Sequence, residues 1–143
     1  MQSTQLAKRT FNKVEVSMKL QEKTDEGILQ IATPIMDNLM DGANESDWQK
    51  HTMHFTDGAR AGLTESDLLK QCESYHATHG YFENRNYLGI TRHPDYVNIL
   101  WRQTMTRTQG EYIAYLSLVE KDGEYQVIRC WVDLWDPKGI QPA

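Results

Sequence analysis

Two histidine pairs are the first residues in this sequence whose spacing suggests chemistry. His51 and His54 are three positions apart, as are His76 and His79. Each pair lies in a segment with helical periodicity, so that both imidazoles would share one helix face. A metal site built across two helices is therefore a geometric option. Neither pair has a carboxylate at ligand spacing, and no HExxH or Cys/His framework is present. We expect surface or helix-end histidines, and we predict no metal and no cofactor.

Asp133 is the carboxylate that is best placed for acid/base chemistry. It lies between Trp131 and Trp135 in a strand-like segment, on the same strand face as Arg129. A general base needs a partly desolvated carboxyl group. An aspartate beside an arginine on a sheet face favours an ion pair instead, and this is the interpretation we adopt. Asp37 falls one position beyond an apolar helical stripe, which predicts exposure to solvent.

Nucleophile motifs are absent from the sequence. It contains no Gly-x-Ser-x-Gly motif and no Gly-rich phosphate loop. Cys72 and Cys130 fall at apolar positions without CxxC spacing. Because apolar burial raises a thiol pKa, neither is expected to be reactive. They indicate reduced, buried thiols in a cytoplasmic protein. Whether the protein is an enzyme is left open.

Composition narrows the class of protein. The 143 residues are 39% hydrophobic and 24% charged, as in a single globular domain. A net charge of −5 argues against a nucleic-acid partner. No apolar stretch has the length of a membrane span, and the N-terminus has no apolar signal-peptide core. We predict a flexible segment over 1–12, one domain over 13–136 and a tail over 137–143.

A long amphipathic helix is predicted over residues 25–40, because apolar residues recur there at spacings of three and four. Pro34 should kink or restart this helix, and the Asp-Gly pair at 41–42 should end it. Residues 14–21 alternate between apolar and polar, which predicts an extra N-terminal strand. Because lysine and glutamate are poor strand formers, a helix is the alternative for this segment.

Two shorter helices should follow. The first carries Trp48 and Phe55 and should close at the turn 56–58. The second should begin at Thr64, where Asp67 stands three residues on in a capping-box-like arrangement.

The rest of the chain indicates an antiparallel meander. Four runs rich in β-branched and aromatic residues cover 81–92, 96–108, 111–120 and 124–135. Asp-Gly at 122–123 is a strong signal for a type I′ hairpin turn. Helices followed by a meander predict an α+β fold, with the helices packed on one face of the sheet.

Alternation assigns the two faces of the last strand. The core face should carry Ile128, Cys130, Val132 and Leu134, and the opposite face Tyr125, Val127, Arg129, Trp131, Asp133 and Trp135. A sheet covered only by helices should have a polar outer face, but here both faces are apolar. Either a partner subunit or the extra N-terminal strand must cover the outer face. We expect a homodimer through this face, with Arg129, Trp131, Asp133 and Trp135 at the interface.

The pattern resembles the nuclear transport factor 2-like superfamily, also called cystatin-like or SnoaL-like. The resemblance rests on the helix end MDNLMDGANESDWQKHTMHF, the helix start LTESDLLKQ and the hairpins GEYIAYLSLVEKDGEYQVIRCWVDL, and it covers about residues 25–135. It implies a strongly curved sheet, like an incomplete barrel, wrapped around the long helix. It also implies a cone-shaped pocket at one end and homodimers through the outer sheet face.

The superfamily includes ketosteroid isomerases, polyketide cyclases, dehydratases, epoxide hydrolases and non-catalytic binding modules, so the fold does not choose a function. The segment that often supplies an acidic base in isomerases and cyclases is contracted here to HFTDGARAGL. Its only carboxylate is Asp57, in a Thr-Asp-Gly turn, so no catalytic base is carried over.

The predicted function is binding of a small apolar or aromatic ligand in the cone. The alternatives are an acid/base lyase or isomerase, and a protein-interaction module that uses the aromatic sheet face. The many tyrosines and tryptophans suit a ligand pocket, but they would equally fill a core. The residues expected to line the pocket are Met36, Trp48, Phe55, Tyr75, Ile128, Cys130 and Val132.

Overall fold

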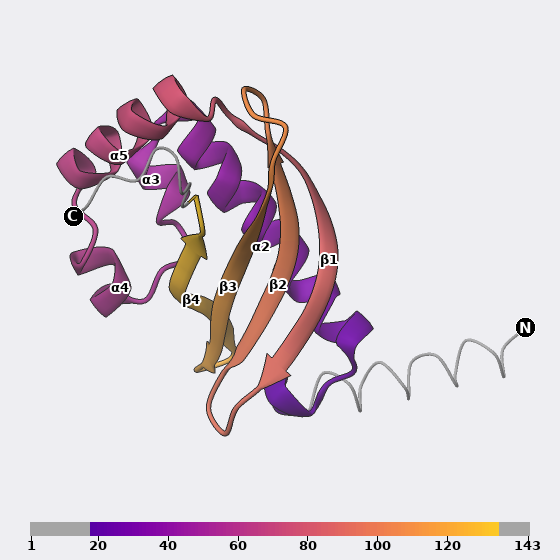
Figure 1. The fold of residues 1–143 in the computed structure, drawn as a ribbon. Coiled ribbons are helices and arrows are strands. Elements are labelled where there is room, and N and C mark those ends of the chain that lie inside the picture. The colour runs from indigo at the N-terminus through magenta and orange to yellow at the C-terminus, as the bar shows by residue number, and fades with distance from the viewer. Residues whose placement is uncertain (1–17, 135–143) are drawn as a thin grey trace, which may run out of the picture.

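A computed structural model describes residues 18–134 of the chain (Figure 1). The predictions for 1–12 and 137–143 lie outside this range, as do residues 14–17 of the predicted N-terminal strand. No helix within the described range has both the length and the hydrophobicity needed to cross a bilayer. In chain order, the elements are η1 (Leu20–Glu22), α2 (Asp25–Glu45), α3 (Trp48–His51), α4 (Asp57–Ala61), α5 (Glu65–Thr78), β1 (Phe82–Arg92), β2 (Val97–Met105), β3 (Glu111–Lys121) and β4 (Glu124–Val132).

The predicted α+β class is confirmed. The four strands form one antiparallel sheet in the order β1-β2-β3-β4. The sheet is curved but not closed, and α2 runs behind it along its concave side (Figure 1). Residues 18–21, the described end of the predicted N-terminal strand, lead into the 3-10 turn η1 instead, and Leu20 of this turn is buried in the core.

Helix α2 is the element around which the sheet curves. It begins where the Thr24 side chain accepts a 3.0 Å hydrogen bond from the Gly27 backbone N–H. Pro34 lies on its exposed side without ending it. The predicted end at 41–42 is wrong, because the helix continues to Glu45 and stops at Ser46, whose φ is 54°.

Gly42 explains that error. It is buried, and a Cβ added to it would lie 2.5 Å from the backbone nitrogen of His51 in α3. The absence of a side chain at Gly42 therefore allows α3 to approach α2 closely, whereas the sequence suggested that this glycine ends the helix.

The turn signals give one correction and two confirmations. Residues 56–58 do not close a helix, because the Thr56 hydroxyl accepts a 3.1 Å bond from Ala59 N–H and so begins α4. The predicted capping box between Thr64 and Asp67 is present at the start of α5. Asp122 and Gly123 both have positive φ, as a type I′ turn requires.

The core fills the space between α2 and the concave face of the sheet. Met36 of α2, Ile99 of β2 and Leu116 of β3 have no exposed surface and belong to one cluster. Met36, expected to line a pocket, lies inside this packed cluster.

A bulge in β4 changes the predicted faces of that strand. Leu118 pairs with Val127, while Ser117 pairs with Arg129, so Ile128 is the extra residue. Val127 is fully buried in the core, which corrects its predicted outward position. Beyond the bulge the alternation resumes, and Cys130 packs against the core.

Candidate functional site

A polar pocket of about 370 Å³ opens between α2 and the first half of β1. One wall is a single face of α2, because residues four apart on a helix lie one above the other. The other wall is the start of β1, and a tryptophan of β2 adds to the lining. The lining residues are Thr33, Asp37, Asp41, Glu83, Asn84, Arg85 and Trp101.

Arg85 is the central side chain of this pocket. The register of β1 against β2 shifts between Phe82 and Arg85, and this irregularity turns both residues toward the concave side. The arginine side chain is only 11% exposed. Its Nη2 donates to the Asp37 carboxylate, and its guanidinium carbon lies 5.9 Å from the ring centre of Trp101. Its Nε is buried and has no hydrogen-bond partner among residues 18–134.

Gln103 lies directly opposite Arg85 in the β1–β2 pairing and is fully buried. Its amide nitrogen donates to the backbone oxygens of Thr104, at 2.9 Å, and Asn84, at 3.3 Å. These two bonds fix the orientation of the amide, since a flipped amide would set oxygen against oxygen. The amide oxygen is buried without a partner within the described range. Arg85 and Gln103 thus present an unsatisfied donor and an unsatisfied acceptor on paired residues.

The mouth of the pocket is acidic. Asp41 on α2 and Glu83 on β1 are exposed, and neither forms an ion pair with another described residue. Asp37 differs from them, because Arg85 balances its charge.

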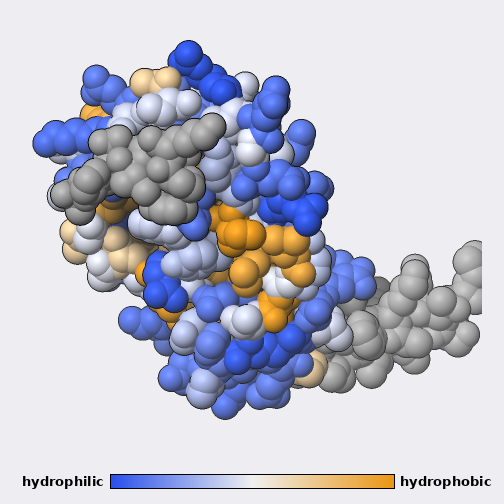
Figure 2. Space-filling model, viewed as in Figure 1, coloured by the Kyte–Doolittle hydropathy of each residue, from blue (hydrophilic) through white to orange (hydrophobic). Residues whose placement is uncertain are grey.

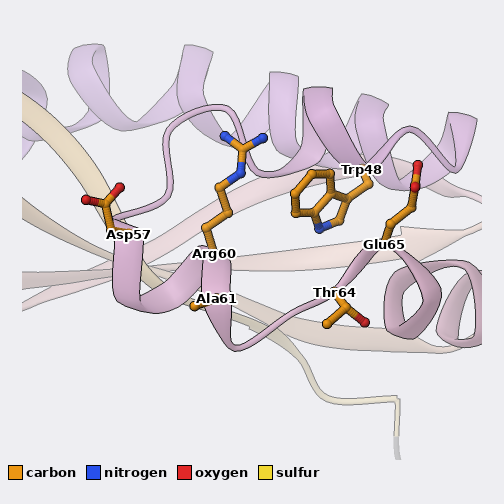
Figure 3. Close-up of a pocket in the computed structure, with 6 residues that line it drawn as sticks. All are labelled: Trp48, Asp57, Arg60, Ala61, Thr64 and Glu65. Atoms are coloured by element: carbon orange, nitrogen blue, oxygen red, sulfur yellow. The ribbon is translucent and has the colours of Figure 1, made fainter.

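A second, shallower pocket of about 450 Å³ lies among α3, α4 and the start of α5 (Figure 3). The Arg60 guanidinium carbon lies 4.5 Å from the ring centre of Trp48, and the indole N–H donates to Leu63 O at 2.7 Å. Asp57 and Glu65 lie at opposite ends of the pocket. Trp48, which we expected to line a pocket, lines this one.

The other expected pocket residues lie elsewhere. Phe55 forms a parallel bridge with Val127, and Ile128 is the bulge residue. The Tyr75 hydroxyl is 3.2 Å from the Cys72 sulfur, and Val132, like Cys130, packs against the core. Of the seven residues, none is in the lining of the α2–β1 pocket. Binding through the predicted set stays a prediction.

The Cys130 thiol and the Tyr75 hydroxyl are held neutral. Burial raises the pKa of Cys130 to about 12, although the positive charge of Arg85 lowers it in part. Burial also raises the Tyr75 pKa well above its usual value, and the hydrogen bond with Cys72 adds to this effect. At neutral pH these groups therefore act as packing and hydrogen-bonding groups.

The histidine pairs lie apart from the polar pocket. His51 Nδ1 is 2.9 Å from Leu39 O, and burial lowers its pKa. The His76 ring packs between Tyr75 and Tyr81, with ring centres 4.7 Å and 4.4 Å away. Within residues 18–134, no three His, Cys, Asp or Glu side chains are grouped so that they could hold a metal ion.

The outer sheet face carries a hydrophobic patch. Leu100, Tyr115 and Trp131 are paired across β2, β3 and β4, and Trp131 is 58% exposed. Figure 2 shows the hydrophobic surface over the middle of β2 and β3. Arg129 lies over the Tyr115 ring at 5.5 Å. Of the predicted interface residues, Trp135 lies outside the described range. Arg129, Trp131 and Asp133 are exposed.

Comparisons with known proteins give likenesses of structure alone. No family model matches the sequence, and no curated protein matches it. A structure of Bd1075 from Bdellovibrio bacteriovorus superposes with a TM-score of 0.47 at 12% identity, over 76% of this chain and 41% of that chain. A candidate aromatic ring hydroxylase from Novosphingobium aromaticivorans gives a TM-score of 0.45 at 10% identity, over 76% of this chain and 89% of its own. The function of neither protein transfers to this chain at these identities.

Proposed function

We propose that this protein binds a small polar molecule in the α2–β1 pocket, without a catalytic step. The observation that carries the proposal is Arg85, which lines the pocket and whose buried Nε has no hydrogen-bond partner within residues 18–134. Buried polar groups nearly always have partners, and each orphan costs about 1–3 kcal/mol. The oxygen of a ligand hydroxyl or carboxamide accepts a hydrogen bond, so it would satisfy the Arg85 Nε–H.

Exposure of the carboxylates favours binding over acid/base chemistry. A general base needs a partly desolvated carboxyl group. The Asp37 side chain is 58% exposed and is already paired with Arg85, and Asp41 and Glu83 are exposed as well. The lyase or isomerase alternative therefore has less support than a binding role.

Arg85→Lys provides the test. Lysine keeps the positive charge near Asp37 but has no N–H at the Nε position. We expect native mass spectrometry of the purified protein to reveal a co-purified polar ligand, with at least tenfold weaker binding in the variant. Arg102→Lys on the exposed outer face is the matched control and should bind as the parent does. No bound ligand, together with no thermal shift from a panel of polar metabolites, would overturn the proposal, and so would equal binding by Arg85→Lys.

We further propose that the chain is a divergent member of the nuclear transport factor 2-like superfamily and is cytoplasmic. The curved sheet around α2 supports the first proposal. Two free cysteines, one of them fully buried, support the second.

A homodimer through the outer face is the accompanying proposal. Exposed Trp131 and Ile113 support it, since a monomer gains nothing from large apolar groups in water. Light scattering of the parent protein at micromolar concentration should give twice the mass of one chain. The Trp131→Glu variant should give the mass of a single chain. A clean monomer of the parent protein under these conditions would refute the dimer.

A further inference from the structure

We infer that the ligand of the α2–β1 pocket carries an organic cation, a primary amine or a guanidinium, at the end that faces the mouth. This inference rests on the proposed binding function and specifies the ligand class. Asp37, Asp41 and Glu83 contribute three carboxylates to the lining, and Arg85 is its only cation. The Arg85–Asp37 pair is internally balanced, so two negative charges remain for the ligand to neutralise.

The remaining carboxylates approach the mouth from different walls. Asp41 is on α2, one helical turn beyond Asp37, whereas Glu83 is on β1, two residues before Arg85. A cation between the two walls therefore meets carboxylates on both sides. Their side chains hold no ion pair within residues 18–134, so binding would break no existing interaction.

The neighbouring lysine does not fill this role. Lys50 is close enough to Asp41 for the carboxylate to contribute to its raised pKa, but the main cause is its hydrogen bond to Glu45. Its ammonium group lies 2.9 Å from Glu45 and does not line the pocket. Asp41 therefore stays available to an external cation.

Size and ligand geometry favour an organic cation over a metal ion. No three potential metal-binding side chains are grouped anywhere in the described part of the chain. The pocket of about 370 Å³ is much larger than a metal ion, and its size suits a small organic molecule. At its inner end, the unpartnered Nε–H of Arg85 suits the acceptor oxygen of a hydroxyl or carboxamide. The preferred ligand thus combines a cationic end with a neutral polar end, as an amino alcohol or amino amide does.

The test compares three classes of probe by the amide chemical shifts of residues 37–41 and 83–85 in the full chain. Ethanolamine, lysinamide and agmatine represent cations, glycerol and acetamide represent neutral polar molecules, and acetate and succinate represent anions. We expect saturable shifts with the cations, and tightest binding by those with a neutral polar end. The isosteric pair Asp41→Asn and Glu83→Gln, made together, should weaken cation binding at least tenfold.

The control distinguishes local charge from overall charge. Glu73→Gln with Glu124→Gln removes the same two negative charges from exposed positions on α5 and β4. This control should bind cations as the parent does. Equal weakening in both double variants, or binding only of neutral or anionic probes, would overturn the cation assignment and leave the binding function intact. No saturable shift with any class would overturn both.

Discussion

Gly42 lies where α2 and α3 approach most closely, and substitution there tests this contact. Alanine normally stabilises a helix interior relative to glycine by about 1 kcal/mol. Here its Cβ would meet backbone atoms of His51 at 2.5 and 2.7 Å, and backbone cannot move aside as a flexible side chain would. We expect Gly42→Ala to lower the free energy of unfolding by about 1–3 kcal/mol, measured by urea denaturation.

Gly58→Ala is the matched control. Gly58 is also helical, in α4, but a Cβ there meets nothing within 4 Å. This substitution should leave stability unchanged or raise it by up to about 1 kcal/mol. If the two substitutions changed the free energy of unfolding equally, helix propensity alone would determine the effect of alanine at Gly42.

Arg85 shows why the residues of the polar pocket could not be identified from the sequence. In the sequence it is one of several arginines separated by polar residues, with no motif around it. Simple alternation from Phe82 would place Arg85 on the opposite face, but the register shift between them returns it to the concave side. Asp37 was predicted to be exposed, and its side chain is 58% exposed. Its pairing with Arg85, 48 positions away, depends on the fold and leaves no local signal.

The bulge in β4 makes a prediction at the scale of the strand. Alternation alone makes Ile128 a core residue and Val127 a surface residue, whereas the structure buries Val127 completely. We expect Val127→Ala to cost about 2 kcal/mol of unfolding free energy, from lost burial and the cavity left behind. Ile128→Ala should cost no more than half as much, although it removes a larger group. Urea denaturation that ranks the two variants in the reverse order would exclude the bulge.

The sequence predicted elements best where one local interaction decides the structure. The capping box of Thr64 with Asp67 and the positive-φ pair at 122–123 are of this kind, and both are present. The Asp-Gly pair at 41–42 failed as a helix end because a tertiary contact, with His51, determines the role of that glycine. The faces of β4 were predicted correctly only beyond the bulge at Ile128, since one extra residue exchanges the two faces.

Two partly buried histidines make the stability of the whole molecule depend on pH. Burial lowers the pKa of His51 and of His76 below the usual 6.5, and a backbone hydrogen bond offsets this only in part. The unfolded chain therefore takes up protons first as the pH falls. The contribution of each histidine is fully present above about pH 6.5 and is lost as the pH falls from there toward the folded-state pKa.

We expect urea midpoints to fall between pH 7.5 and pH 5, and His51→Gln to reduce this fall. Glutamine retains a donor for Leu39 O but does not titrate. Adding His76→Gln should reduce the fall further. A pH dependence that is unchanged in the double variant would show that other groups control it.

At the scale of the molecule, the α+β class and the order of helices before a four-stranded meander followed from the sequence, because hydrophobic periodicity reports directly on helix and strand. The packing of the interior could not be predicted from the sequence, because composition cannot distinguish a cone filled by side chains from an open one. Met36, Ile99 and Leu116 fill the space between helix and sheet, and the polar pocket lies at the margin of that core, beside Trp101.

The short bridge between Phe55 and Val127 has a consequence for assembly. The backbone N–H of Val127 donates to His54 O at 2.7 Å, and its carbonyl accepts from Thr56 N–H at 3.0 Å. At this point the outer edge of β4 is closed to strand addition. At the opposite edge, β1 is interrupted by two register shifts, which also hinder the pairing of a foreign strand. Both margins of the sheet are thus interrupted as templates for edge-to-edge pairing, which favours face-to-face docking of a second copy.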